Sequence, residues 1–159
     1  MSKILIFGNS GSGKSTLAKD LASKHDLGHL DLDTVAWEPS QPTIRRPQDE
    51  AKIAIKNFTD SHPNWVIEGC YADLLGLLTN QASEAIFLNL SIQACIANAK
   101  SRSWEPHKYA SKQAQDANLD MLITWIAAYD TRQDSFSRQA HEKLFKQFSG
   151  KKTLLTANQ

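Results

Sequence analysis

A glycine-rich octapeptide near the amino end of the chain, Gly8-Asn-Ser-Gly-Ser-Gly-Lys-Ser15, fits the pattern G-x-x-x-x-G-K-[ST]. It follows an apolar run at residues 3–7 and precedes residues 14–24, whose apolar side chains recur at helical spacing. A loop of this kind turns backbone N–H groups inward and aims the positive end of the helix dipole at a bound anion. The sequence therefore predicts a strand, a phosphate-binding loop and a helix, in this order.

Lys14 and Ser15 give this loop its specific chemistry. We expect the Lys14 ammonium to bind the β- and γ-phosphates of ATP, and the Ser15 hydroxyl to ligate a Mg²⁺ ion that bridges them. Thr16 is expected nearer the α-phosphate. The residues predicted to bind the nucleotide are Gly8, Asn9, Ser10, Gly11, Ser12, Gly13, Lys14, Ser15 and Thr16.

Short apolar runs alternate with helical patterns along the rest of the chain, which is typical of βαβ units and a parallel sheet. The predicted strands are residues 3–7, 29–32, 65–67, 85–90 and 153–155, and the predicted helices are 14–24, 47–58, 92–99, 119–126 and 136–148. Residues 37–47 hold three prolines and are expected to be irregular. The predicted fold class is α/β, a three-layer P-loop NTPase fold with helices on both faces of a five-stranded parallel sheet. Ligands of such sheets gather beyond the carboxyl ends of the strands.

Length and charge limit the possible partners. The chain has 159 residues, which matches one domain at residues 1–159, and its net charge of +1 creates no global positive field for nucleic acid. Too few apolar residues precede the glycine loop for a signal peptide or a membrane span. We therefore expect a cytoplasmic protein with no membrane partner and no nucleic-acid partner, while the oligomeric state stays open.

Three acidic residues lie at the ends of predicted strands, where they can face the loop. Glu68 follows the third strand and is a candidate to hold Mg²⁺ through a bound water. Asp31 and Asp33 alternate along the end of the second strand, so their side chains are expected on one side of the sheet. We expect Asp31 to serve Mg²⁺, and Asp33 to orient or deprotonate an acceptor hydroxyl. The plainer alternatives are a solvated acid at Glu68 and a strand cap at the two aspartates.

Residues 103–117 lack regular periodicity, and we call them the lid segment. Five potential cations lie in it or beside it, namely Lys100, Arg102, His107, Lys108 and Lys112. A closing basic segment excludes water and stabilises the transferring phosphoryl group, a role we expect of Arg102. A solvated basic face is the alternative. On the acceptor side, which we place at residues 34–60, the groups that could bind an acceptor or cover the core are Trp37, Arg45 and Arg46, with Tyr71 and Trp104 elsewhere in the chain.

The other histidines and the two cysteines show no pattern that indicates chemistry. The spacing of His25, His29, His62 and His141 pairs none of them as metal ligands, so we expect these residues to be structural or exposed. Cys70 and Cys95 are expected to be reduced core residues.

Nearly the whole chain resembles the adenylate-kinase-like group of P-loop kinases, and most closely the small bacterial proteins labelled topology modulation proteins. The matching segments are residues 8–16, 29–39, 65–71 and 85–91, and the helix that bears Trp125 and Tyr129. By this resemblance, Asp31 and Asp33 fall where related kinases hold Mg²⁺ or the acceptor, and Arg102 matches the second arginine of a pair near the lid. The chain departs from the group at Asn98, where the first arginine is usual, and at Glu68, where aspartate is usual. Both departures argue against strong adenylate kinase activity.

These features predict ATP- and Mg²⁺-dependent transfer of the γ-phosphoryl group to a small molecule, with Lys14, Asp33 and Arg102 as catalytic residues. The acceptor is either similar to a nucleoside monophosphate or an unphosphorylated hydroxyl compound, as in sugar or shikimate-type kinases. One alternative is a regulatory or nucleic-acid-associated ATPase with slow hydrolysis, and another is a nucleotide-binding protein without turnover. Only a kinase consumes ATP faster when one specific acceptor is present.

Overall fold

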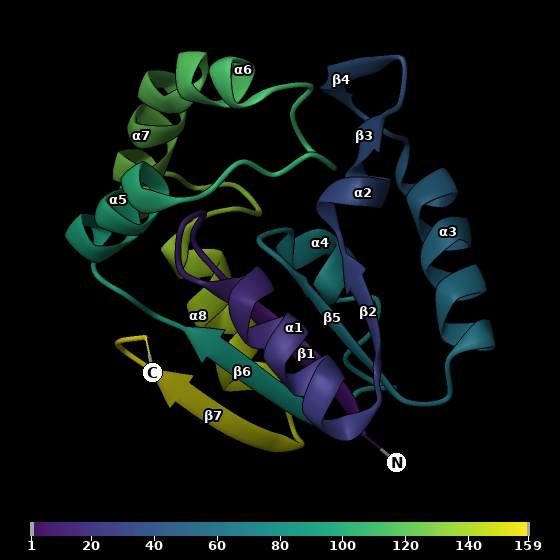
Figure 1. Cartoon of the computed structure of the whole chain (residues 1–159). Helices are drawn as coiled ribbons and strands as arrows, with labels where there is room; N and C mark the ends of the chain where they lie inside the picture. Colours follow the sequence, from purple (N-terminus) through teal and green to yellow (C-terminus); the bar gives the residue numbers. More distant parts are fainter. Residues whose placement is uncertain (1, 159) are drawn as a thin grey trace.

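A computed structural model describes residues 2–158, and its centre is a parallel sheet of five strands. The strands are β1 (Lys3–Gly8), β2 (Gly28–Asp31), β5 (Trp65–Gly69), β6 (Glu84–Leu88) and β7 (Lys151–Leu155). Their order across the sheet is β2-β5-β1-β6-β7 (Figure 1). β1 and β5, whose residues are almost all buried, lie inside the sheet, as expected of apolar strands covered on both faces. The predicted parallel sheet and its five strands are confirmed.

The strand register brings polar residues together at one end of the sheet. β1 pairs with β5 so that Ile6 lies opposite Glu68 and Phe7 lies opposite Gly69. β2 pairs with β5 so that Asp31 also lies opposite Glu68. Because the strands run in the same direction, the glycine loop after β1 meets both carboxylates beyond the carboxyl end of the sheet.

Helices cover both faces of the sheet. On one face lie α1 (Lys14–His25), α5 (Ile92–Ser101) and α7 (Leu119–Ala127), and on the other lie α3 (Gln48–Ser61), α4 (Ala72–Leu75) and α8 (Arg138–Gln147). Ile4 and Ile6 of β1 pack toward the first group, and Leu5 and Phe7 toward the second, as the two-residue period of a strand requires. Figure 1 shows α1 in front of the strands and α8 behind them. The chain thus has three layers, with an apolar core on each side of the sheet.

Serine caps set the starts of two of these helices. The Ser91 hydroxyl accepts a hydrogen bond of 3.1 Å from the N–H of Ala94, which confirms the predicted start of α5. Ser137 caps α8 in the same way, so α8 begins later than predicted. Phe136 therefore precedes the helix, and its ring packs 5.2 Å from that of Trp125.

The segment at residues 37–47 is more regular than predicted. It forms a hairpin of β3 (Trp37–Glu38) and β4 (Gln41–Arg45), preceded by α2 (Asp33–Ala36). The prediction of an irregular segment is wrong because of where the prolines fall. Pro39 lies in the turn and Pro47 lies beyond β4, whereas Pro42 lies within β4, which as a strand of a two-stranded hairpin has one edge without a partner and can hold a proline there.

The lid segment is regular in its second half. Residues 112–117 form α6 (Lys112–Ala117), whose cap Ser111 accepts a hydrogen bond of 3.0 Å from the N–H of Ala114. Because no residue of α6 is buried, the sequence gives no apolar period there, and the prediction of irregular structure is wrong for this half. Residues 103–111 form a loop that reaches from α5 toward α2 (Figure 1), and a 3₁₀ turn, η1 (Ala128–Asp130), follows α7.

Candidate active site

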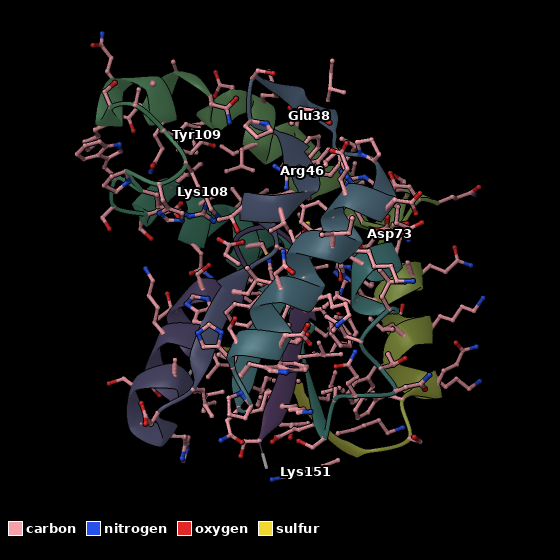
Figure 2. All side chains as sticks on the ribbon, turned by 90° about the vertical axis from the view of Figure 1, so that its right-hand side faces the viewer. Glu38, Arg46, Asp73, Lys108, Tyr109 and Lys151 are labelled. Carbon is pink, nitrogen blue, oxygen red and sulfur yellow. The ribbon has the colours of Figure 1, made fainter. Side chains whose placement is uncertain are left out.

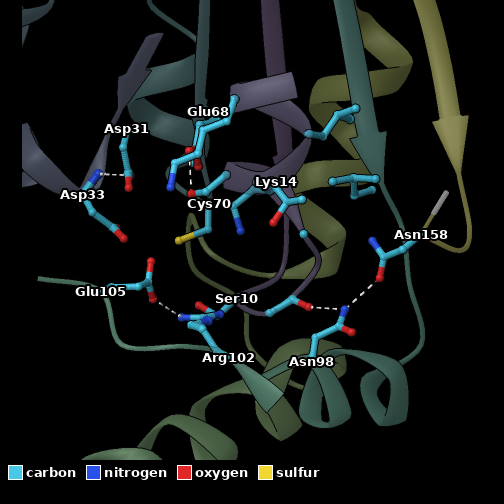
Figure 3. Close-up of a pocket in the computed structure, with 18 of the residues that line it drawn as sticks. Ser10, Lys14, Asp31, Asp33, Glu68, Cys70, Asn98, Arg102, Glu105 and Asn158 are labelled. Atoms are coloured by element: carbon cyan, nitrogen blue, oxygen red, sulfur yellow. Dashed lines mark hydrogen bonds and ion pairs between the residues drawn. The ribbon is translucent and has the colours of Figure 1, made fainter. Parts of the chain in front are cut away.

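A cavity of about 880 Å³ opens at the carboxyl end of the sheet, between the glycine loop and the lid segment (Figure 3). Six residues predicted for catalysis or metal binding line it together: Lys14, Ser15, Asp31, Asp33, Glu68 and Arg102. They come from α1, β2, α2, β5 and the end of α5. The structure therefore gathers distant parts of the chain around one space.

The glycine loop owes its shape to residues that adopt positive φ angles. Gly11 has a φ of 78°, and a side chain there would place its Cβ 2.4 Å from the carbonyl oxygen of Cys95. Gly13, with a φ of 91°, directly precedes α1. Such left-handed residues turn successive N–H groups to one side, which is the geometry of an anion site.

Not every residue predicted to bind the nucleotide faces the cavity. Asn9 is buried, and its side-chain amide donates a hydrogen bond of 3.2 Å to the carbonyl oxygen of Ile126. Ser12 is also buried. The Lys14 ammonium, in contrast, lines the cavity and donates to the carbonyl oxygen of Asn9 at 2.7 Å. The side chain of Asn9 therefore anchors the loop, while that of Lys14 is available to a ligand.

Ser15, Glu68 and His29 form a chain of contacts at the end of β5. The Glu68 side chain is 2% exposed, and its Oε2 accepts a hydrogen bond of 2.6 Å from the Ser15 hydroxyl. The same oxygen lies 2.9 Å from Nε2 of His29. No motif in the sequence indicates a chemical role for His29. Its two-residue spacing from Asp31, on the same side of β2, is the signal that could have placed it here.

Asp31 and Asp33 reach the cavity in a way that the sequence did not predict. β2 ends at Asp31, and Asp33 begins α2, so the prediction of two aspartates on one strand is wrong. Oδ1 of Asp31 accepts a hydrogen bond of 2.9 Å from the N–H of Asp33, a local turn that ends the strand. This turn still brings both carboxylates to one side of the cavity (Figure 3).

Lys108 of the lid segment contacts both aspartates, and the charges change one another's pKa. Its Nζ lies 2.8 Å from Oδ2 of Asp33 and 3.4 Å from Oδ2 of Asp31. Burial opposes the charge on Lys108, but the two aspartates raise its pKa well above the ordinary value. Burial also opposes the charge on Asp33, whose pKa is nevertheless lowered by Lys108 and by the Tyr71 hydroxyl. Burial, followed by repulsion from Asp33 and Glu68, raises the pKa of Asp31.

Aromatic residues support Asp33 from behind. The buried hydroxyl of Tyr71 donates to Oδ1 of Asp33 and accepts a hydrogen bond of 2.7 Å from Nε1 of Trp37. Burial raises the pKa of Tyr71 well above its ordinary value, so its hydroxyl stays a donor. Arg45 lies 5.0 Å from the centre of the Tyr71 ring and bonds to Asp73 at 3.1 Å. Tyr71, Trp37 and Arg45 thus pack on one side of Asp33, and we call these three residues the wall behind Asp33.

The predicted lid cations divide between the cavity and the surface. Arg102, directly after α5, lines the cavity, and its Nη1 donates to Oε1 of Glu105 at 3.1 Å. His107 lies 3.8 Å from Oδ2 of Asp31. Lys112 instead pairs with Asp116 on the exposed surface of α6. The sequence analysis did not single out Glu105, because one acid within a basic loop carries no motif.

Asn98 braces the glycine loop at the position where the resemblance expects an arginine. Its amide donates hydrogen bonds of 2.8 Å to the carbonyl oxygen of Gly11 and to Oδ1 of Asn158. Asn158 in turn donates to the carbonyl oxygen of Ser12 at 2.9 Å. Figure 3 shows Asn98 and Asn158 side by side, across the cavity from Asp33. A residue beyond the last predicted strand gave no sequence signal for this role.

Other candidate groups lie away from the cavity. The Arg132 guanidinium lies 3.5 Å from the centre of the Trp125 ring, and Arg138 bonds to Asn89 and Asp130. Both arginines therefore support the packing around α7 and α8.

Comparison with known families agrees with the geometry of the glycine loop. A family model described as an AAA domain matches residues 4–119. The chain belongs to this family. The matched residues include the glycine loop, both aspartates, Glu68 and the whole lid segment.

Solved structures of kinases are similar to this chain at low sequence identity, and one of them has a TM-score above 0.5. Deoxyadenosine kinase from M. mycoides, solved with bound dATP, is 12% identical, with a TM-score of 0.51 over 97% of this chain and 90% of that chain. A shikimate kinase from Bacteroides thetaiotaomicron is 20% identical, with a TM-score of 0.47 over 79% and 78% of the two chains. A sugar kinase from Janibacter is 16% identical, with a TM-score of 0.49 over 80% and 95%. The predicted three-layer P-loop fold is confirmed. No curated protein sequence matches the chain.

Two features are absent from residues 2–158. No helix in this range is long and apolar enough to cross a membrane. The same residues contain no group of three or more His, Cys, Asp or Glu side chains that could hold a metal ion. A metal ion bound at Ser15 would therefore need oxygen ligands from a bound substrate or water.

Cys70 is a free thiol beside Tyr71, and burial raises its pKa to about 12.

Proposed function

We propose that this protein is an ATP- and Mg²⁺-dependent kinase that transfers the γ-phosphoryl group to a hydroxyl of an unphosphorylated small molecule. The observation that carries this proposal is that one cavity is lined by Lys14 and Ser15 and also by Asp33 and Arg102. Hydrolysis needs only a water beyond the γ-phosphate, whereas a kinase needs a polar site that aligns an acceptor. The carboxylate of Asp33 supplies such a site.

The donor groups around the glycine loop fit a magnesium triphosphate. The Ser15 hydroxyl can ligate the ion directly. Glu68, whose Oε2 lies 2.6 Å from that hydroxyl, can hold one of the waters on the ion. Mg²⁺ suits a site with few protein ligands because it keeps several waters and takes phosphate oxygens. Ser15 and Glu68 would hold the ion, which would supply positive charge against the negative charge that develops on the phosphates during transfer.

Each of the three catalytic residues acts on a different part of the reaction. Asp33 orients the acceptor hydroxyl and takes its proton as the oxygen bonds to the γ-phosphorus. The bond between this phosphorus and the β–γ bridging oxygen breaks, and ADP leaves with the electron pair. Lys14 stabilises the phosphate oxygens from the loop side, and Arg102 stabilises the transferring group from the lid side. The lid segment closes to exclude water.

The charges at the lid end of the cavity favour an acceptor without a phosphate. Asp31, Asp33 and Glu105 provide carboxylates there, and the cations Arg102 and Lys108 are already paired with them. An acceptor phosphate would be repelled by these carboxylates. Arg102 is needed by the transferring phosphoryl group, and turning Lys108 toward an acceptor phosphate would leave partly buried carboxylates without a cation, which is costly.

Other readings of the sequence keep less support. The likeness to the topology modulation proteins rests on sequence segments alone. A net charge of +1 gives a role on nucleic acid no electrostatic basis. A regulatory ATPase is therefore the alternative outcome of the experiment below.

The test measures Mg·ATP turnover with a panel of nucleoside monophosphates, sugars, sugar acids and shikimate. We expect one unphosphorylated acceptor to raise turnover by about tenfold or more, and Asp33→Asn to lose this gain. Asp49→Asn, on the exposed start of α3, is the matched control and should keep it. If no acceptor raises turnover while ATP still binds, the kinase proposal is wrong and the regulatory one is favoured.

A further inference from the structure

The ammonium group of Lys108 lies among three carboxylates. Its Nζ is 2.8 Å from Oδ2 of Asp33, 3.4 Å from Oδ2 of Asp31 and 3.7 Å from Oε2 of Glu105. The Lys108 side chain is only 21% exposed. Figure 2 shows Lys108 at the end of the molecule opposite to Lys151, which begins β7, and Figure 3 shows the three carboxylates bordering one part of the cavity. A cation is thus held at the point where the proposed acceptor must enter.

The partners of this cation belong to different parts of the molecule. Asp31 and Asp33 lie at the end of β2 and the start of α2, whereas Lys108 and Glu105 lie in the loop of the lid segment. When the lid segment moves away to admit an acceptor, Lys108 and Glu105 leave together. Asp31 and Asp33 then keep their negative charges but lose the ammonium group of Lys108.

Loss of the Lys108 cation would leave carboxylate oxygens of Asp31 and Asp33 without a partner. Oδ1 of Asp33 accepts from Tyr71, so Oδ2 is the oxygen left for a ligand, and Lys108 now covers it. The Asp31 side chain is only 10% exposed, and its Oδ2 is buried without a hydrogen-bond partner. A buried carboxylate oxygen with neither a hydrogen bond nor a cation is strongly unfavourable.

The other cations that line the cavity are engaged or placed elsewhere. Arg102 bonds to Glu105, Lys14 is needed by the phosphates of ATP, and Lys19 is exposed on α1. Lys24 of α1 pairs with Asp20 at 3.0 Å. The charge that Lys108 provides is therefore best replaced by the ligand itself.

We infer that the acceptor carries an ammonium group near its reacting hydroxyl, and that this ammonium takes the place of Lys108 between Asp31 and Asp33. This inference rests on the proposed kinase function and names its substrate class as amino alcohols, including amino sugars. A neutral acceptor leaves the carboxylates uncompensated, and an anionic one adds repulsion. The protonated amine has no lone pair, so the hydroxyl remains the group that attacks phosphorus. Lys108 acts as an internal stand-in for the amine until the acceptor arrives.

The first experiment asks whether the seat of Lys108 binds an ammonium group. Lys108→Ala removes the internal cation, and its melting temperature is measured with ethylammonium chloride, sodium chloride or magnesium chloride at equal ionic strength. At about ten times its dissociation constant, ethylammonium should raise the melting temperature of this variant by about 3–6 °C, beyond any effect of sodium. Lys112→Ala, which removes an exposed lid cation, is the matched control and should show no specific rise. Stabilisation by magnesium but not by ethylammonium would make the seat a metal site and overturn the inference.

The second experiment measures kcat/KM for pairs of acceptors that differ in one amino group, with a phosphorylated sugar as a further comparison. Glucosamine is compared with glucose and glucose 6-phosphate, and an aminocyclitol with the matching cyclitol. We expect the amino compound of at least one pair to be preferred about tenfold or more, and Asp31→Asn to reduce this preference. A preference for neutral or phosphorylated acceptors overturns the inference while the kinase function stands. If no acceptor accelerates turnover, the proposed function fails, and the inference fails with it.

Discussion

In the proposed reaction, the cavity has a donor end at Lys14 and Ser15 and an acceptor end at Asp33, Tyr71 and Lys108, and the chain builds these two ends in different ways. At the donor end, Lys14 and Ser15 belong to one octapeptide whose backbone shape is fixed by glycines with positive φ. At the acceptor end, Asp33, Tyr71 and Lys108 come from three separate segments and meet only through side-chain contacts. One end is therefore encoded locally, and the other depends on the whole fold.

This difference teaches how such a protein can change its substrate. A backbone that cradles phosphate tolerates little change, because a Cβ at Gly11 would collide with the carbonyl oxygen of Cys95. The acceptor end can be altered through single side chains in a loop, which leaves the glycine loop untouched. Substitutions at the two ends should accordingly have separable effects on nucleotide use and on acceptor use.

The largest effect is expected from removing the cation of the donor end. Lys14→Met keeps the length of the side chain but removes the charge that stabilises the phosphates. Turnover of Mg·ATP should fall about a thousandfold, both with an acceptor and without one. The matched control is Lys52→Met on the exposed face of α3, which should leave turnover unchanged. If Lys14→Met lost only the acceptor-dependent part, the division of the cavity into two ends would be wrong.

A second prediction concerns His141, a buried residue of α8 that contacts the backbone of Cys70 in the lining of the cavity. Its Nε2 must donate to the carbonyl oxygen of Cys70, at 2.8 Å, so its Nδ1 accepts from the Tyr129 hydroxyl. Burial lowers the pKa of His141 from 6.5 to about 4 in the folded protein. Between these values the unfolded chain binds a proton that the folded chain does not. The free energy of unfolding should therefore fall by about 3 kcal/mol as the pH is lowered from about 6.5 to about 4, and should change no further from this cause below.

Chemical denaturation at pH 7.5 and pH 4.5 checks this prediction. His141→Gln should be less stable at pH 7.5 but should lose this share of the acid sensitivity, whereas the exposed His25→Gln should retain it. Equal acid sensitivity in His141→Gln and the unaltered protein would contradict the prediction. His141 holds the backbone of Cys70, which lies between Glu68 and Tyr71 in the sequence. We therefore expect acid to destabilise the segment that carries residues of both ends of the cavity.

The same contrast explains what the sequence could predict. The glycine loop, its flanking strand and helix, and the parallel sheet follow from short-range patterns, and all are present in the structure. Glu68 could be named because it ends an apolar strand. The spacing of His29 from Asp31 could place His29 on the same side of its strand, but not in contact with Glu68, because that contact depends on β2 lying next to β5 in the sheet.

The acceptor end shows where sequence reasoning fails. Asp31 and Asp33 were placed on one strand because alternation is the simplest pattern, but a hydrogen bond from the N–H of Asp33 to Asp31 ends the strand first. The sequence singles out Arg102 among the five lid cations and gives Lys108 no role, and only the fold shows that Lys108 meets both aspartates. α6 escaped prediction because an exposed helix of six residues leaves no apolar period.

A third prediction separates metal binding at the donor end from acceptor binding. Glu68→Gln keeps an oxygen that can accept from Ser15 but removes the negative charge near the expected Mg²⁺. The Mg²⁺ concentration for half-maximal turnover should rise about 10- to 100-fold. The KM for the acceptor at saturating Mg²⁺ should change little. Glu84→Gln, at the opposite end of the sheet, serves as the control. A large rise in acceptor KM with unchanged Mg²⁺ dependence would move Glu68 to the acceptor end.

The smallest effect is expected from Tyr71→Phe at the acceptor end. This change removes the hydroxyl that donates to Asp33 and accepts from Nε1 of Trp37. The KM for the acceptor should rise several-fold to about tenfold, since one hydrogen bond that orients Asp33 is worth about 1 kcal/mol. The KM for Mg·ATP should stay the same, because the donor end does not use this hydroxyl.

A double-mutant cycle decides whether Trp37 acts through Tyr71 or on the acceptor directly. If Trp37 only holds the Tyr71 hydroxyl, Trp37→Phe should add almost nothing to the acceptor KM once Tyr71→Phe is present. If the two effects add in full, Trp37 contacts the acceptor itself. The wall behind Asp33 would then be part of the binding surface, and the acceptor end would extend to the hairpin of β3 and β4.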